Sequence, residues 1–266
     1  MNKPDKRRLA ALWRRVMNSE VKTLLIFVVV MGAWGVAMWL DDNAANTNAA
    51  SNGVHQAQQA PPFGRGGGGL PPREKAEAGR AHHHRILFIG DSMLEGLMRR
   101  FGDYAAENGH ELDVVLWYSS STELWAKGDV LERSLRKYRP TFVVVCLGSN
   151  ELFVRDLPKR EQYVATIVQR VDSLPFVWIG PPNWRKDTGI NDVIVRHVGP
   201  HRYFDSRRLT LERSSDHMHP TMRAAAQWMD SVAAWMNSPR TAQPIPMNLP
   251  QKKGKPAHVE LLQPEG

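Results

Sequence analysis

Three residues that could form a hydrolytic triad are spread along the chain. Ser92 follows an apolar run in the stretch ILFIGDSMLEGL (86–97), and Asp216 and His219 stand three positions apart. A serine hydroxyl becomes an effective nucleophile when an imidazole accepts its proton and a carboxylate fixes the tautomer of that imidazole. In one tight turn, Asp216 can face one ring nitrogen of His219 while the other faces Ser92. These three residues are therefore the candidate catalytic group.

Each residue also has an ordinary structural explanation. Asp91 and Ser92 can cap a helix that begins after them, and Asp216 can cap the last helix while His219 lies on the surface. Taken together, the residues favour catalysis. His217 is expected to point elsewhere, although His-x-His beside an aspartate is also typical of zinc sites. No further ligand is predicted nearby, so neither a metal nor another cofactor is expected.

Attack by a serine on an acyl group also requires donors for the oxyanion that forms, each worth about 3 to 4 kcal/mol. Asn150, in the stretch GSNE (148–151), can offer its side-chain amide. The backbone N–H of Ser92 can offer a second donor. Ser92 and Asn150 are therefore expected to form part of an oxyanion hole.

Short apolar runs alternate with helical patterns between residues 85 and 240. This alternation predicts βαβ units and a parallel sheet with both faces covered. In such sheets the reactive groups gather at the carboxyl ends of the strands, where the residues described above are expected to lie. The expected strands are 85–90, 112–118, 141–148, 176–180 and 202–205, and the expected helices are 93–108, 128–138, 158–173, 189–197 and 221–237.

The stretches GDS (90–92) with Gly96, GSNE (148–151) and DHMHP (216–220), in this order, resemble the motifs of the SGNH or GDSL hydrolases. The resemblance covers about residues 85–237. It implies an α/β fold, a three-layer α/β/α sandwich with a parallel, flavodoxin-like sheet, and a serine that attacks esters or thioesters.

The resemblance also implies a third oxyanion donor, the N–H of a glycine after the second strand. This chain has YSSSTEL (118–124) there, and Ser121 is the closest counterpart. A serine keeps that N–H without strain if its φ is negative, but not if the site needs a positive φ. Asp91 and Glu151 are expected to be structural.

Two further residue types could contribute to a site. Cys146 is the only cysteine, so no intramolecular disulfide can form, and its apolar neighbours predict a buried side chain. Trp184, together with Trp117 and Trp125, could bind a sugar ring by stacking, although such tryptophans are more often partly buried in a core. Trp184 is kept as a candidate substrate-binding residue.

The N-terminal region is expected to anchor the chain in a membrane. Residues 1–22 carry seven Lys or Arg against Asp5 and Glu20, and residues 23–40 carry no charge. As a helix, those eighteen residues span about 27 Å, close to the thickness of a bilayer. A buried core helix and a cleaved signal peptide are the alternatives. The positive charges before residues 23–40 and the two aspartates directly after them predict a cytoplasmic N-terminus. The rest of the chain is then expected in the periplasm, as in a single-pass protein of a bacterial inner membrane.

The regions on either side of the predicted domain at 85–240 have the composition of disordered segments. Residues 41–84 are rich in Asn, Ala, Gln, Pro and Gly and are expected to be a flexible linker, with the histidine run at 82–84 solvated. Residues 241–266 contain five prolines and are expected to be a disordered tail.

The charge of the predicted domain and its expected location exclude some classes of function and favour others. Residues 85–240 carry 21 basic and 19 acidic side chains, so nucleic acid is excluded as the main partner. We expect a serine esterase that acts on O-acyl esters, with acetyl as the expected acyl group, of a cell-envelope glycan. An O-acyltransferase with the same triad and a non-catalytic binding or assembly module with the same fold are the alternatives.

Overall fold

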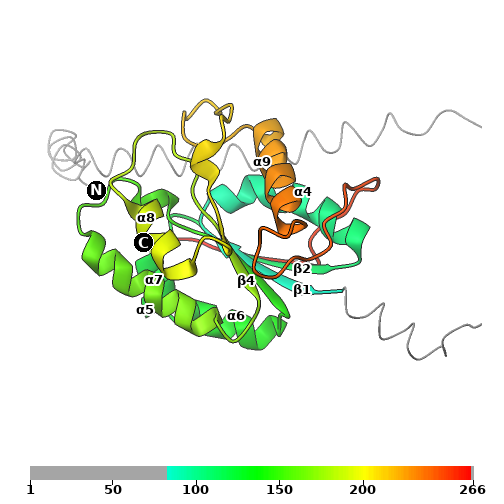
Figure 1. The fold of residues 1–266 in the computed structure, drawn as a ribbon, viewed down its shortest axis with the longest axis horizontal. Coiled ribbons are helices and arrows are strands. Elements are labelled where there is room, and N and C mark those ends of the chain that lie inside the picture. The colour runs from blue at the N-terminus through cyan, green and yellow to red at the C-terminus, as the bar shows by residue number, and fades with distance from the viewer. Residues whose placement is uncertain (1–82, 265–266) are drawn as a thin grey trace, which may run out of the picture. The chain divides into compact units, whose positions relative to one another are not determined.

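The computed structural model describes residues 83–264 of the chain. These residues belong to one compact unit, drawn as a coloured ribbon in Figure 1. The expected basic tail, membrane span and most of the expected linker lie outside the described residues. Within the described residues, no helix is both long enough and apolar enough to cross a membrane.

A parallel sheet of six strands forms the centre of the described unit. Its order is β5-β4-β3-β1-β2-β6, and every neighbouring pair is parallel. The first five strands follow the doubly wound order 2-1-3-4-5, which confirms the expected flavodoxin-like sheet. The strands are β1 (Arg85–Gly90), β2 (Glu111–Trp117), β3 (Phe142–Cys146), β4 (Phe176–Ile179), β5 (Tyr203–Phe204) and β6 (His258–Leu262).

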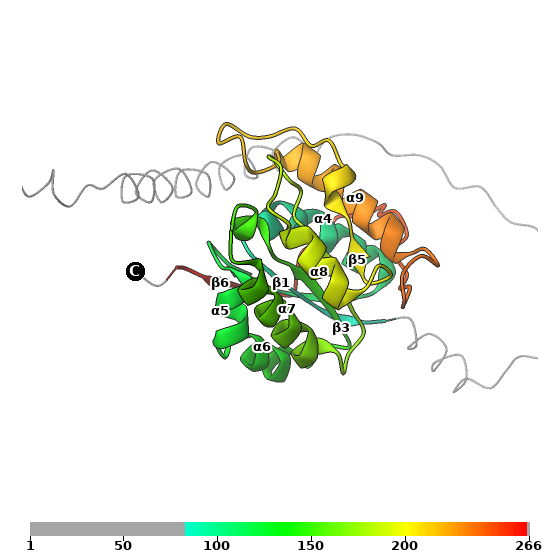
Figure 2. The ribbon, with the colours of Figure 1, turned by 60° about the vertical axis from the view of Figure 1, so that its left-hand side comes forward.

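Helices cover both faces of this sheet and complete the three layers, as Figures 1 and 2 show. One face packs against the first and last of these helices and the other packs against the four between them, so each face has its own apolar core. The helices are α4 (Met93–Asn108) and α9 (Met222–Met236) on one side, and α5 (Thr122–Lys127), α6 (Val130–Tyr138), α7 (Leu157–Val171) and α8 (Ile190–Val198) on the other.

The central strands are apolar along their whole length because both of their faces are buried. In β3, every residue from Phe142 to Cys146 is buried, and alternate side chains enter the two cores. Cys146 is a free thiol that is 2% exposed, and burial raises its pKa well above the ordinary value. The expectation that this cysteine serves packing is therefore confirmed.

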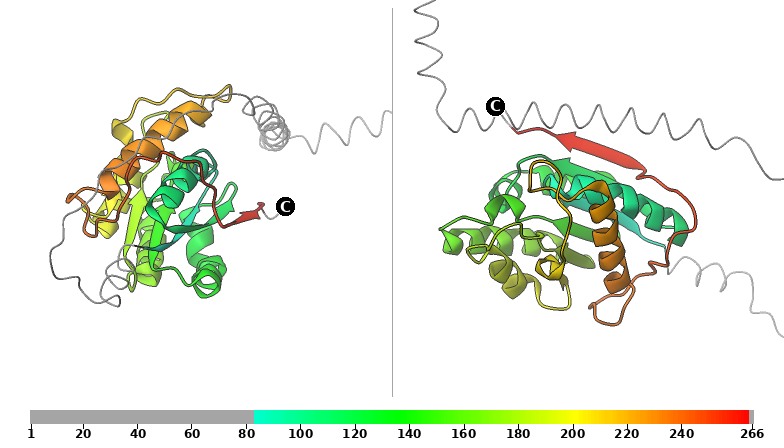
Figure 3. Two further views of the ribbon diagram at one scale, coloured as in Figure 1. Left: turned by 90° about the vertical axis from the view of Figure 1, so that its right-hand side faces the viewer. Right: turned by 90° about the horizontal axis from the view of Figure 1, so that it is seen from above.

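The expected disordered tail at 241–266 is wrong for most of its length. Ile245 and Met247 are buried in the core beside α9, and β6 pairs with β2, at the edge of the sheet that Figure 3 shows. The five prolines concealed this order, because the segment is held by burial and by contacts with distant residues. His110 Nε2 lies 2.7 Å from the carbonyl oxygen of Pro246, and Asn108 forms two hydrogen bonds with the backbone of Asn248.

Two glycines let the C-terminal segment pass close to α4. A Cβ atom at Gly254 would lie 2.3 Å from the carbonyl oxygen of Gly102, and a Cβ at Gly102 would lie 2.9 Å from the Cα of Lys255. Real Cβ contacts are not this short, so both positions require the absence of a side chain. The contact guides the segment around α4 to the edge where β6 adds to the sheet.

Candidate active site

The structure brings Ser92, His219 and Asp216 together at the carboxyl end of the sheet. His219 Nε2 lies 2.9 Å from Ser92 Oγ, and His219 Nδ1 lies 2.6 Å from Asp216 Oδ2. Ser92 follows β1 directly and precedes α4, so a strand end and a helix start fix its backbone. The alternative of a simple helix cap does not describe Ser92, whose side chain makes no capping hydrogen bond.

A short hairpin-like loop carries the other two members of the group. Its two arms are joined by hydrogen bonds from Thr221 N to Glu212 O at 2.9 Å and from Ser214 N to His219 O at 2.8 Å. At its tip, His217 has a φ of 60° and donates its N–H to Ser214 O. His217 is exposed, as expected for the histidine outside the triad.

The carboxylate of Asp216 is held by donors on its own loop. Its Oδ1 accepts hydrogen bonds from Ser214 Oγ at 2.9 Å, Met218 N at 2.8 Å and His219 N at 2.9 Å. Burial acts to raise the pKa of Asp216, but the hydrogen bonds from Met218 and His219 outweigh it and lower the pKa to about 2. Asp216 is therefore ionised at any pH near neutrality, as the partner of an imidazole must be.

Arg213 ties this loop to the neighbouring one. Its guanidinium donates to the carbonyl oxygen of Met218 at 2.8 Å and to that of Pro182 at 3.1 Å. Met218 lies between the two histidines, and Pro182 lies in the loop that follows β4. Arg213 also donates to the carbonyl oxygen of Asn183 at 3.4 Å. Sequence reasoning missed Arg213, because these partners are backbone carbonyls that no motif marks.

Asp91 fixes the turn that carries the nucleophile. Its two carboxylate oxygens accept hydrogen bonds from Met93 N at 3.0 Å and Ser149 N at 3.2 Å, which join the ends of β1 and β3. Asp91 is fully buried, and burial raises its pKa. Asp91 thus makes the structural contacts expected for it, and Ser92 is left free to face His219.

Three candidate donors for the oxyanion lie at the carboxyl end of the sheet, as Ser92 does. Within the described residues, the backbone N–H groups of Ser92 and Ser121 have no hydrogen-bond partner. The side-chain amide of Asn150 donates one hydrogen to the carbonyl oxygen of Ser120 at 2.9 Å, which leaves its second hydrogen available. The three donors come from the ends of β1, β2 and β3, where the sequence places them.

The backbone conformation of Ser121 shows that this position does not need a glycine. Ser121 has a φ of −125° and a ψ of 168°, an extended conformation that any residue adopts. The positive φ in this loop occurs two residues earlier, at Ser119, whose φ is 57°. Serine at position 121 therefore presents its N–H without strain.

Glu151 holds the two loops of this donor group together. Its carboxylate accepts hydrogen bonds from Thr122 N at 2.8 Å and Thr122 Oγ1 at 2.7 Å, and Arg160 Nε lies 3.4 Å away. Glu151 follows Asn150, and Thr122 follows Ser121, so this buried contact sets the distance between the two donors. Glu151 was expected to be structural, but Thr122 and Arg160 were not recognised in the sequence.

Trp184 has an aromatic partner and lies in the loop after β4, which Arg213 joins to the loop of Asp216 and His219. It is half-buried, and its ring meets that of Phe153 edge-to-face with centroids 5.9 Å apart. Phe153 is 48% exposed and was missed in the sequence, since a single Phe after GSNE has no distinguishing pattern. Trp117 and Trp125 are both buried and pack against each other, as the more common case of core tryptophans predicts.

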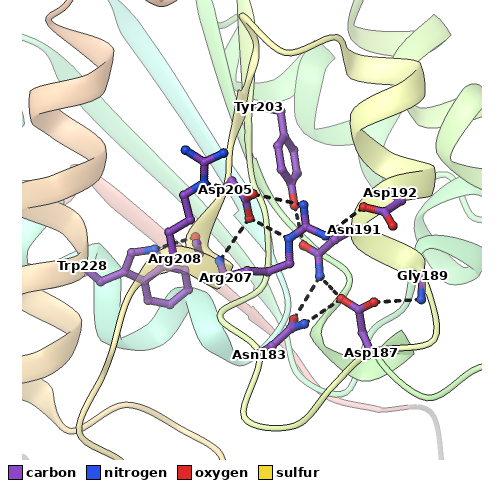
Figure 4. A network of polar contacts seen from close by, with 11 residues as sticks. Asn183, Asp187, Gly189, Asn191, Asp192, Tyr203, Asp205, Arg207, Arg208 and Trp228 are labelled. Atoms are coloured by element: carbon purple, nitrogen blue, oxygen red, sulfur yellow. Dashed lines mark hydrogen bonds and ion pairs between the residues drawn. The ribbon is translucent and has the colours of Figure 1, made fainter.

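Trp184 follows Asn183, which belongs to the polar network drawn in Figure 4. Asn191, which is fully buried, donates to Asn183 Oδ1 at 3.0 Å and to Asp187 Oδ2 at 2.6 Å, and it accepts a hydrogen bond from the hydroxyl of Tyr203. Asp187 also accepts from Gly189 N at 2.8 Å. Trp184 thus lies in a loop whose shape is set before any ligand binds.

Glu95 is a further acidic group next to the nucleophile. It lies one turn after Ser92 on α4, and its carboxyl hydrogen-bonds with Tyr118, which follows β2. Burial raises the pKa of Glu95 above its ordinary value. A single glutamate on a helix carries no recognisable motif, so the sequence did not indicate it.

Comparison with known proteins finds similarity among solved structures. No family model matches the sequence, and no curated protein matches it. Among solved structures, a crystal structure of TesA is similar over 59% of this chain and 99% of that one, with 18% sequence identity and a TM-score of 0.46.

Proposed function

We propose that this chain is a serine esterase of the SGNH or GDSL type. One observation carries the proposal: Ser92 Oγ, both ring nitrogens of His219 and the Asp216 carboxylate form one continuous hydrogen-bonded series at distances of 2.9 and 2.6 Å. That arrangement meets the geometric requirement for a nucleophile, its base and the group that orients the base.

In the proposed reaction, Ser92 Oγ attacks the carbonyl carbon of an ester while His219 Nε2 takes the hydroxyl proton. The carbonyl oxygen becomes an oxyanion, which the N–H groups of Ser92 and Ser121 and the amide of Asn150 stabilise. His219 then gives the proton to the leaving alcohol as the C–O bond breaks, and an acyl group remains on Ser92. Water, activated by His219, releases that acyl group as a carboxylic acid and restores the serine.

The alternative of transfer to a second hydroxyl uses the same residues, because only the acceptor in the final step differs. A non-catalytic module was the other alternative, and its main support was the missing glycine after the second strand. The negative φ of Ser121 favours activity instead, since the N–H of this residue is presented as a glycine would present it.

We further propose that the substrate is an O-acetylated glycan of the bacterial cell envelope. The exposed ring of Phe153 and the half-buried ring of Trp184 support this class, because aromatic side chains bind the apolar faces of sugars. The expected membrane span at residues 23–40 supports an enzyme held at the inner membrane with its site in the periplasm.

Two measurements test the proposal on the full-length chain. A fluorophosphonate should label wild-type protein at Ser92 and leave Ser92→Ala unlabelled, and acetate should be released from an O-acetylated glycan. Absence of labelling together with absence of acyl release would support the non-catalytic alternative. A reporter fused to the C-terminus should show a periplasmic location, and a cytoplasmic report would contradict both the topology and the envelope substrate.

A further inference from the structure

Three potential metal ligands converge at the edge of the sheet opposite to Ser92. Asp113 of β2 is the register partner of His258 of β6, and Glu111 lies two positions earlier on β2, with its side chain on the same face. One donor atom from each of the three side chains lies within 4.8 Å of the other two. They stand at the amino ends of their strands, whereas Ser92 follows the carboxyl end of β1.

Among the described residues, the buried carboxylate of Asp113 has an imidazole as its side-chain partner and no Lys or Arg beside it. Asp113 is 3% exposed, and its one side-chain partner is His258 Nδ1 at 2.7 Å from Asp113 Oδ1. Within residues 83–264, the Glu111 carboxylate has no hydrogen bond, and no Lys or Arg lies within 4 Å of either acid. A buried carboxylate costs free energy unless it is paired, and a second carboxylate nearby adds repulsion.

Glu260, another acid near the cluster, differs from Asp113 in having basic side chains within 4 Å. Glu260 lies two positions beyond His258 on β6, and its carboxylate has Lys137 at 2.7 Å and Arg133 at 3.9 Å. Among the described residues, the fold therefore places Lys137 and Arg133 beside Glu260, whereas the more buried Asp113 has only the imidazole of His258. A bound cation would remove this deficit.

We propose that Glu111, Asp113 and His258 bind one transition-metal ion, with Zn²⁺ as the best chemical match. One imidazole nitrogen and two carboxylate oxygens are a donor set that zinc accepts, and a water can fill the fourth position of a tetrahedron. The ion replaces the proton that His258 Nδ1 shares with Asp113 Oδ1. That proton passes to solvent, so binding weakens as the pH falls.

The proposed ion would act on stability and not on the esterase reaction. Asp113 and Glu111 belong to β2, and His258 belongs to β6, so coordination joins the C-terminal strand to the rest of the sheet. A ligand that binds only the folded state stabilises it in proportion to the logarithm of its concentration over its Kd. The site stands apart from Ser92, so this inference holds even if the chain is not an esterase.

The test uses Zn²⁺ itself and the full-length chain. We expect calorimetry to show a saturable zinc site and thermal unfolding to show a rise in Tm with added Zn²⁺. His258→Ala and Glu111→Gln alter exposed side chains, so both variants should fold, and both should lose at least about tenfold in affinity. His217→Ala, which removes an exposed histidine elsewhere, is the matched control and should bind zinc as the wild type does.

Two outcomes would overturn the proposal. Zinc binding that is equal in wild type, His258→Ala and Glu111→Gln would assign it to other histidines, such as the run at 82–84. An equal rise in Tm with Mg²⁺, which does not favour imidazole, would show a general response to divalent charge and no transition-metal site. Co²⁺ gives a third readout, because a tetrahedral site produces visible absorption that His258→Ala should abolish.

Discussion

His219 Nε2 lies 2.9 Å from Ser92 Oγ, although 127 positions separate the two residues in the chain. The contact joins the start of the first α/β unit to the loop before the last helix. Each partner is fixed independently, Ser92 by the end of β1 and His219 by the hydrogen bonds of the Asp216 loop. The predictions below follow from this contact and from the residues that maintain it.

Removal of either partner should abolish catalysis to a similar degree. We expect Ser92→Ala, His219→Ala and the double variant to lose comparable activity, about 10⁴- to 10⁶-fold in kcat, because members of a triad act as a unit. His217→Ala should retain most of the activity, since that side chain is exposed. Hydrolysis of p-nitrophenyl acetate measures all four proteins. An inactive His217→Ala beside an active His219→Ala would show that the wrong histidine was assigned as the base.

The activity should fall at low pH because of a single protonation. kcat/KM should rise with pH on the acid side, because His219 Nε2 accepts the proton of Ser92 only while it is unprotonated. The pKa of Asp216, lowered to about 2, keeps this carboxylate ionised between pH 4 and 9, so it adds no second step. A pH–rate profile from 4 to 9 measures the effect. Full activity at pH 4 would contradict a mechanism that needs a neutral imidazole.

The proposed oxyanion donors should differ in their response to substitution. Asn150→Ala removes a side-chain donor and should lower kcat by about 10²- to 10³-fold with little change in KM. Ser121→Gly and Ser121→Ala keep the backbone N–H, and the φ of −125° suits all three residues, so both variants should stay within a few-fold of wild type. Steady-state kinetics on one ester compares them. A large gain of activity in Ser121→Gly would show that the serine strains the site.

Arg213 should act as a positioning residue. Arg213→Met removes the hydrogen bonds to Met218 and Pro182, and we expect a loss in kcat of up to about 10²-fold with a smaller change in KM, because His219 is displaced. Arg213→Lys should restore little of that loss, since an ammonium cannot span both carbonyls as the planar guanidinium does. Arg196→Met, at an exposed position of α8, is the control. Equal losses in kcat for Arg213→Met and Arg196→Met would contradict this role.

His110 should make the stability of the fold depend on pH. Its Nδ1 accepts a hydrogen bond from His84 N at 3.1 Å, which requires an unprotonated nitrogen, and burial lowers the pKa of His110 below 6.5. The unfolded chain then binds a proton more readily than the folded chain, so this contribution is present above pH 6.5 and is lost as the pH falls through the folded pKa. Tm measured between pH 7.5 and 5 should fall less steeply in His110→Gln. Parallel curves for the two proteins would exclude His110 as the cause.

The sequence predicted those parts of the molecule that short local patterns determine. The apolar run at 86–89 predicted a buried strand, and its abrupt change at Gly90 placed Ser92 at a strand end. The spacing of Asp216 and His219 likewise predicted that one loop would carry both. In each case neighbours in sequence are neighbours in space, so periodicity and spacing contain the information.

The residues that sequence reasoning missed depend on contacts between distant segments. Glu151 with Thr122 is a pairing of two loops that no local pattern reports. Phe153 and Arg213 are single residues, and each contacts the loop after β4, which is distant from it in the sequence. The same cause explains β6, since its order comes from pairing with β2, about 145 positions away, and the prolines nearby suggest the opposite.

The pairing of β6 with β2 also affects which fragments of this protein should be soluble. A fragment that stops at residue 240 would leave β2 at the edge, with a row of unpaired N–H and C=O groups flanked by the apolar residues Val114–Leu116. Such an edge invites pairing with other chains and leads to aggregation. A recombinant fragment should therefore extend through residue 264, and insolubility of a shorter one would reflect the uncovered strand and not a defect of the triad.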